Sequence, residues 1–203
     1  MAFAPLPVSF YEPSAKVVAS KLLGHILVRQ TSAGPCGGVI VETEAYLHDD
    51  PASHGFHRET PRNRAMFGPP GRAYVYFIYG NHYCFNAVCG AAGIAEAVLV
   101  RAIAPALGET LMRRNRTVMK RRDLTNGPAK FCEALAIDRT LDGVDLCAAN
   151  SPVFIAANPD WKRVRREHGP LVTTTRIGIK RAAELPLRFY LGGSEFVSRR
   201  AVS

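Results

Sequence analysis

Residues 39–46 alternate between apolar and polar side chains in the way that predicts a β-strand. A period of two places Glu42, Glu44 and Tyr46 on one face of that strand. Two neighbouring carboxylates are costly to bury without partners, whereas exposed carboxylates at a sheet edge are the common case. The pattern alone therefore leaves a buried functional pair and a solvated edge as equal alternatives.

Tyrosines mark the next predicted element, a hairpin over residues 72–88. Gly80-Asn81 is typical of a two-residue turn between antiparallel strands. Tyr74 and Tyr76 should share a face, and Tyr79 should stand near the tip. An exposed aromatic tip suits a wedge pushed between DNA bases, but a hairpin folded against the body would bury the same rings in the core.

The rest of the pattern predicts short helices and strands. Helices are expected over 15–23, 108–122 and 127–136, and further strands over 25–30, 95–103, 153–157, 172–179 and 187–191. Residues 31–37 read as a turn, 48–72 as a long irregular loop, and 1–10 as a loose arm. Helices and mostly antiparallel strands in this mixture predict one α+β domain over residues 1–203.

Composition narrows the class of partner. The 203 residues carry 26 Lys and Arg against 17 Asp and Glu, a formal net charge of +9. Such a basic surface favours an anionic partner, with nucleic acid the first candidate. No apolar run reaches transmembrane length, and the start lacks the features of a secretory signal. We therefore expect a cytoplasmic protein that associates with the nucleoid through DNA, not with a membrane.

The cysteines point to the same compartment. Five of them are scattered along the chain, an odd number that predicts reduced thiols. His82, Cys84 and Cys89 are close in sequence, but their spacing fits zinc patterns poorly. We expect neither a metal site nor a cofactor.

Several cations are candidates for chemistry or for phosphate binding. Arg101 lies inside an apolar predicted strand, where it needs a partner, and Glu44 is the candidate. Six basic residues fall between Arg113 and Arg122, either on a solvated helix face or in a phosphate-contacting patch. Lys130 follows Gly127-Pro128 at a predicted helix start, where backbone amides suit a phosphate.

Longer motifs carry a resemblance to a known family. Glu42-Thr43-Glu44-Ala45-Tyr46 is followed in order by 60–67, 74–80, Asn86, 100–102, 127–130 and 187–190. Together they resemble the alkyladenine (3-methyladenine) DNA glycosylase family, in its compact bacterial type, over roughly residues 10–197. Several long motifs in one order are far more specific than any single motif.

The resemblance implies a compact domain with a curved, mostly antiparallel sheet, flanking helices and a protruding β-hairpin. It also implies a monofunctional glycosylase that acts on double-stranded DNA containing damaged purines. A wedge acting on one duplex needs only a monomer, and no obligate protein partner is evident. Alkylated or deaminated purines (3-methyladenine, 7-methylguanine, hypoxanthine and ethenoadenine) would be flipped out and released by hydrolysis, which initiates base excision repair.

Residue roles follow from the same resemblance. Glu44 matches the catalytic base, and Arg101 and a carbonyl near Val197 match groups that hold the water. The pocket for the flipped base would comprise Tyr46, His54, Tyr76 and Asn86, with Asn86 screening out bases that carry a guanine-type amino group. Tyr79 matches the intercalating residue, and Arg62, Arg64 and Lys130 are candidate contacts to the DNA backbone.

The chain departs from the family pattern at two places. A one-residue gap is needed near His54, and polar Asn81 stands beside the predicted wedge where an apolar residue is usual. Glu42 shares a strand face with Glu44. We expect Glu42 to be structural, because most carboxylates in proteins are hydrogen-bonded or lie on the surface.

Two rival functions explain part of the pattern. A non-catalytic basic and aromatic nucleic-acid-binding module accounts for the charge and the tyrosines. It does not account for Glu42 and Glu44, which would repel phosphates. A metal-dependent nuclease would use Asp49, Asp50 and Glu44, although adjacent aspartates in a polar loop are more often solvated.

Overall fold

Strand β2 (Gly34–Tyr46) is the central strand of the sheet in the computed structural model, which describes residues 3–78 and 80–201. Strand β5 (Glu96–Leu107) pairs with one side of β2. On the other side, β1 (Ile26–Thr31) pairs with the first half and β8 (Arg188–Leu191) with the second. Register shifts between Ile40 and Thr43 separate these halves. Bulges of this kind re-aim side chains next to functional sites.

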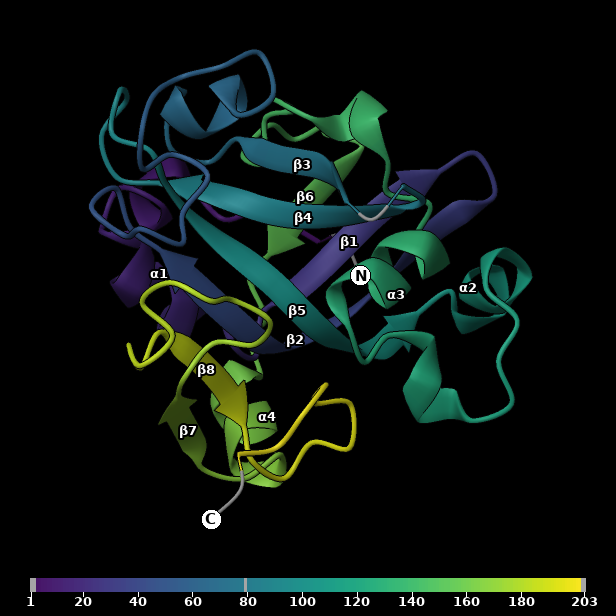
Figure 1. The fold of residues 1–203 in the computed structure, drawn as a ribbon. Coiled ribbons are helices and arrows are strands. Elements are labelled where there is room, and N and C mark those ends of the chain that lie inside the picture. Colours follow the sequence, from purple (N-terminus) through teal and green to yellow (C-terminus); the bar gives the residue numbers. More distant parts are fainter. Residues whose placement is uncertain (1–2, 79, 202–203) are drawn as a thin grey trace.

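The sheet extends outward in both directions from these strands. Beyond β5 lie β4 (His82–Cys89) and β3 (Ala73–Ile78), beyond β1 lies β6 (Val153–Ala156), and β7 (Leu171–Thr174) pairs with β8. Every pairing among the described residues is antiparallel. Figure 1 shows that the eight strands form one strongly twisted sheet.

Four short α-helices flank the sheet. They are α1 (Ala15–Leu22), α2 (Glu109–Asn115), α3 (Pro128–Ala134) and α4 (Trp161–Glu167). Single 3-10 turns occupy Val8–Phe10, Arg64–Phe67, Arg121–Leu124 and Arg139–Leu141. None of the helices in the described ranges has the length and apolarity needed to cross a membrane.

Helix α1 covers the face of β2 that lies opposite Glu44. Its buried residues recur at helical spacing at Ala15, Val18, Ala19 and Leu22. Thr43 fixes the contact, because its hydroxyl donates a hydrogen bond to the Ala19 carbonyl at 2.9 Å. The other face of β2 is thereby left to the polar residues.

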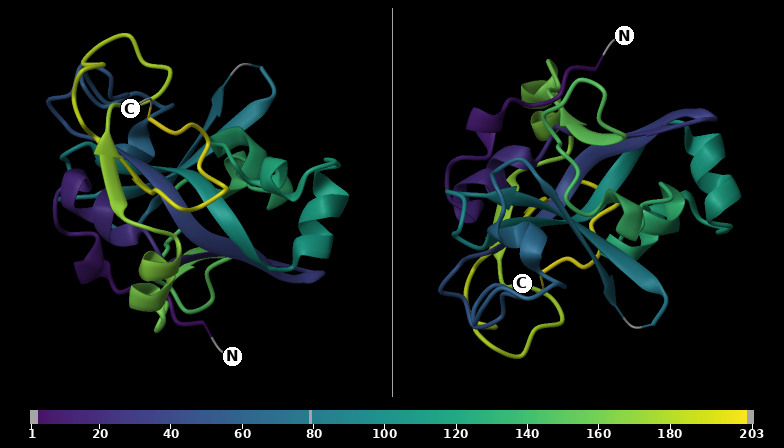
Figure 2. Two further views of the ribbon diagram at one scale, coloured as in Figure 1. Left: turned by 90° about the horizontal axis from the view of Figure 1, so that it is seen from below. Right: turned by 90° about the horizontal axis from the view of Figure 1, so that it is seen from above.

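The predicted α+β class, with a mostly antiparallel curved sheet, is confirmed. The β3–β4 hairpin projects from the body, as Figure 2 shows. The last pair among the described residues is Ile78 with His82. Gly80 lies in the connection and has a φ of +77°, a left-handed conformation that glycine adopts readily in turns.

Other expected boundaries were wrong for local reasons. The arm predicted to be loose is packed: Leu6 is buried, and its amide donates to the Ile155 carbonyl of β6 at 2.8 Å. The helix expected over 108–122 ends at Asn115, before the β-branched pair Thr117-Val118. Helix α4 over Trp161–Glu167 lies outside the three ranges where helices were expected.

Two glycines let β1 and β5 approach β2 closely. A Cβ atom on Gly37 would lie 2.1 Å from the Leu27 carbonyl oxygen, and one on Gly38 would lie 2.3 Å from that of Ala104. Contacts this short require the strands to move apart.

Gly38→Ala should therefore lower the free energy of unfolding by about 1–3 kcal/mol, the range for overpacking. Urea unfolding followed by circular dichroism measures it. Ala106→Val, at an exposed position of β5, is the control and should change stability by less than about 0.5 kcal/mol. Equal stability of Gly38→Ala and wild type would contradict the close packing.

Candidate active site

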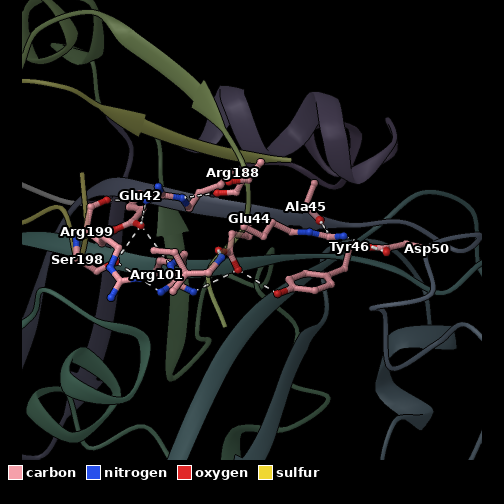
Figure 3. Close-up of polar contacts among 12 residues, drawn as sticks. Glu42, Glu44, Ala45, Tyr46, Asp50, Arg101, Arg188, Ser198 and Arg199 are labelled. Carbon is pink, nitrogen blue, oxygen red and sulfur yellow. Dashed lines mark hydrogen bonds and ion pairs between the residues drawn. The ribbon is translucent and has the colours of Figure 1, made fainter. Parts of the chain in front are cut away.

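The side chain of Glu44 is fully buried near the end of β2 and is surrounded by donors. One carboxylate oxygen accepts from the Tyr46 hydroxyl at 2.9 Å and lies 3.2 Å from an Arg101 guanidinium nitrogen. The other accepts from the Ile177 backbone amide at 2.8 Å. Figure 3 shows Glu44 between Tyr46 and Arg101. A buried carboxylate anion requires hydrogen-bond donors around it, and Glu44 has three.

The Tyr46 hydroxyl acts as a donor in this arrangement. Burial and the neighbouring Glu44 carboxylate raise the pKa of Tyr46 far above its usual range. The phenol therefore keeps its proton and directs it toward Glu44.

Glu42 is the second buried carboxylate and ties three segments together. It accepts hydrogen bonds from Arg101 at 3.2 Å, from Arg188 of β8 at 2.8 Å, and from the amide and hydroxyl of Ser198 at 2.7 and 2.9 Å. Figure 3 shows this cluster beside Glu44. The alternative of a solvated sheet edge is therefore wrong for both carboxylates.

Arg101 is shared between the two carboxylates, and its predicted pairing with Glu44 is confirmed. Burial by itself would lower the pKa of Arg101, but the charges of Glu44 and Glu42 outweigh burial and raise it. Its positive charge is therefore fixed beside Glu44.

A buried ion pair holds Tyr46 from behind. Arg176 bonds to Asp50, donates to the Ala45 carbonyl at 3.0 Å, and lies 4.7 Å from the centre of the Tyr46 ring. Both charged side chains are almost completely buried. Asp50 is therefore engaged by an arginine and is not the solvated or metal-binding aspartate of the nuclease hypothesis. Within residues 3–78 and 80–201, no three His, Cys, Asp or Glu residues are grouped as metal ligands.

A cavity of about 360 Å³ lies beside the residues that contact Glu44. Tyr46, Arg101 and Ile177, the three residues that contact Glu44, all contribute to its wall. Its volume lies within the range of sites that enclose small organic molecules. The other lining residues are Ala52, His54, Met66, Tyr74, Tyr76, Ile78, Cys84, Asn86, Leu99, Pro128, Ala129, Gly178 and Ile179.

The predicted pocket residues His54, Tyr76 and Asn86 meet in this cavity. The ring centres of His54 and Tyr76 lie 4.6 Å apart at an angle of 73°, and a nitrogen of His54 lies 2.9 Å from the Tyr74 hydroxyl. Asn86 donates to the Tyr74 carbonyl at 2.9 Å. Aromatic faces and a few fixed polar groups form the kind of wall that receives a flat heterocycle.

Of the predicted backbone contacts, Arg62 donates a hydrogen bond to the Phe77 carbonyl of the hairpin at 3.3 Å. Arg64 is paired with Glu59 at 3.1 Å, and Lys130 donates to Asn126 at 2.7 Å. Tyr79, the predicted wedge, lies outside the described residues.

Sequence reasoning missed the segment that completes the surroundings of Glu44. That segment contains Ile177, whose amide bonds to Glu44 at 2.8 Å. The carbonyl near Val197, matched to a group that holds the water, stays a prediction, and the neighbouring Ser198 bonds to Glu42. Arg176, an isolated charge between Thr175 and Ile177, was the one available signal.

Comparison with known proteins identifies the family. Residues 9–195 match the family model described as "Methylpurine-DNA glycosylase (MPG)". The chain belongs to the methylpurine-DNA glycosylase family. It is a DNA glycosylase, a hydrolase that acts on N-glycosyl bonds. The binding-only alternative is therefore wrong.

Relatives of this glycosylase match over nearly their whole length. Proteins of Carboxydothermus hydrogenoformans and Methanoculleus marisnigri are 46% and 48% identical, each over 96% of this chain and 99% of the relative. One from Agrobacterium fabrum is 46% identical over 98% of this chain and 95% of its own. All three bear the name "Putative 3-methyladenine DNA glycosylase".

The pocket histidine provides a test by pH titration. His54 is exposed on one side, but partial desolvation of its ring in the pocket, and then the charge of Arg62, lower its pKa below 6.5. Arg62→Gln should raise this pKa only in part, because the desolvation persists. The folded glycosylase binds this proton less readily than the unfolded chain, so His54 lowers stability as the pH falls below 6.5. Titration of the His54 ring by NMR measures the pKa, and a value at or above 6.5 would contradict the lowered pKa.

The Glu42 cluster provides a test of stability. Glu42→Ala leaves Arg101 and Arg188 without a buried partner and should lower the free energy of unfolding by about 3–5 kcal/mol. Glu195→Ala, whose side chain is 63% exposed, should change it by less than about 0.5 kcal/mol. Chemical denaturation of both variants measures the difference, and similar small losses would show that Glu42 is dispensable.

Proposed function

We propose that this glycosylase is monofunctional and hydrolyses the N-glycosidic bond of flipped, damaged purines with a water activated by Glu44. The substrates would be 3-methyladenine, 7-methylguanine, hypoxanthine and ethenoadenine. This proposal is carried by one observation: buried Glu44 is in contact with Tyr46, Arg101 and Ile177, which all line an aromatic cavity of about 360 Å³. A carboxylate in that place can take a proton from water and can stabilise a cationic sugar.

One carboxylate suffices for part of this range. Glycoside hydrolysis normally uses a second carboxyl group as an acid for the leaving group. Purines alkylated at N3 or N7 already carry positive charge and leave without a proton. Glu42, the other acid on β2, is bonded to Arg101, Arg188 and Ser198, which suits a structural role.

Arg101 would orient the carboxylate and not transfer a proton. It lies 3.2 Å from both Glu44 and Glu42, and its raised pKa keeps it charged. Tyr46, His54 and Tyr76 would enclose the purine, and Asn86 would disfavour a base with a guanine-type amino group. The pocket is placed to receive the base only after extrusion, because a stacked base cannot reach a buried carboxylate.

Extrusion would be assisted from the hairpin. Tyr79 follows Ile78 at the end of β3, so a side chain inserted there would fill the gap that the flipped base leaves. Because one wedge and one pocket serve one lesion, we propose that a monomer acts on double-stranded DNA.

The test compares wild type with Glu44→Gln in single-turnover reactions that contain a chelator. The substrates are duplexes with one hypoxanthine or one ethenoadenine, together with methylated DNA. Wild type should release base, and Glu44→Gln should lose at least about 100-fold in rate while still binding DNA, as expected for loss of a general base. Glu195→Gln is the matched control and should keep the wild-type rate.

Other outcomes have distinct meanings. Equal release by wild type and Glu44→Gln would place the catalytic carboxylate elsewhere. A DNA adduct trapped by borohydride would contradict plain hydrolysis, because trapping requires an amine bound covalently to the sugar.

A further inference from the structure

The loop over residues 175–182 joins the base cavity to the molecular surface. Ile177, Gly178 and Ile179 form part of the cavity wall. The next two residues, Lys180 and Arg181, are both exposed. Two cations therefore stand directly beside residues that enclose the cavity.

The loop is fixed at its base. Arg176 is bound to Asp50 and to the Ala45 carbonyl, and it also donates to the Ala182 carbonyl at 3.4 Å, which closes the loop on itself. The Ile177 amide is bonded to Glu44 at 2.8 Å. The charged tip of the loop, Lys180 and Arg181, therefore stands on a rigid base. A rigid base reduces the conformational entropy that the loop loses on binding.

Lys180 and Arg181 have no role in holding the loop. Within residues 3–78 and 80–201, neither side chain makes a hydrogen bond or an ion pair, whereas Arg64 and Lys130 each have a protein partner. The acid nearest to them along the chain is Glu184, which is also exposed. Two adjacent cations repel each other, so an anionic partner would stabilise both.

The geometry of an extruded nucleotide supplies that partner. When a base occupies a pocket, its sugar lies at the mouth, and the phosphates on either side lie at the rim. In both panels of Figure 2, the yellow-green loop that follows β7 lies on the same side of the molecule as the tip of the β3–β4 hairpin. Helix α4, with its own basic residues, lies on the other side.

We propose that Lys180 and Arg181 bind the phosphates next to the extruded nucleotide. This proposal rests on the proposed function, because the pocket must hold a flipped base for its rim to meet these phosphates. The loop would then grip the DNA backbone with its tip and contact Glu44 with its base.

The test measures how DNA binding depends on salt. Each phosphate contact contributes about one unit to the slope of log affinity against log salt. Lys180→Gln combined with Arg181→Gln should therefore reduce the slope by about two for a duplex with one damaged purine. The same change should weaken binding at every salt concentration. Electrophoretic mobility or fluorescence anisotropy over a range of salt measures it.

The matched control is Lys162→Gln combined with Arg166→Gln on α4. It removes the same charge from exposed positions on the far side of the molecule and should leave the slope within half a unit of wild type. Equal slopes for the loop variant and wild type would overturn the proposal. So would equal reductions in both double variants, because these would reflect net charge and not a local contact.

A second readout separates this proposal from the proposed function. Base release by wild type in single-turnover reactions at saturating enzyme tests the proposed function independently of the salt slopes. If wild type binds the damaged duplex but releases no base, the proposed function fails while the salt slopes still decide the phosphate contact.

Discussion

The burial of two carboxylates on one strand is the constraint on which this structure depends. Buried charges persist only when cations and further donors satisfy them. Arg101 of β5 forms ion pairs with both acids, and Arg188 of β8 forms one with Glu42. The buried acids of β2 therefore require a cation on each of these two neighbouring strands. The same requirement fastens the chain near its C-terminus, where Ser198 bonds to Glu42. The sheet therefore supports Glu44 from behind and from both sides.

The surroundings of the cavity divide into a rigid back and a more exposed front. The back consists of Glu44, Arg101 and Tyr46, with Arg176 stacked behind the Tyr46 ring. The front consists of the β3–β4 hairpin and the loop over 175–182, both of which reach the surface near the cavity. We propose that the back supplies the chemistry and the front recognises the distorted duplex. A buried anion can serve as a base only if the surrounding groups keep their positions. Arg101, shared between Glu42 and Glu44, holds these groups in place.

Sequence could predict the features that depend on local pattern. Alternation placed Glu42 and Glu44 together, the apolar surroundings of Arg101 indicated an ionic partner, and the tyrosines indicated the hairpin. It could not predict contacts that arise from folding distant segments together. The Ile177 amide lies 133 residues from Glu44 in sequence, and a backbone donor leaves no trace in side-chain chemistry. Arg176, the partner of Asp50, is 126 residues away in sequence. Two adjacent aspartates in a polar loop have the sequence pattern of a solvent-exposed segment.

A crystal structure of Glu44→Gln bound to a duplex with one hypoxanthine would test the roles of Glu44 and the cavity most directly. We expect an intact N-glycosidic bond and a purine enclosed by Tyr46, His54 and Tyr76. The anomeric carbon should face residue 44 with room for one water between them. A hypoxanthine that remains stacked in the duplex, or one bound outside this cavity, would contradict the central claim.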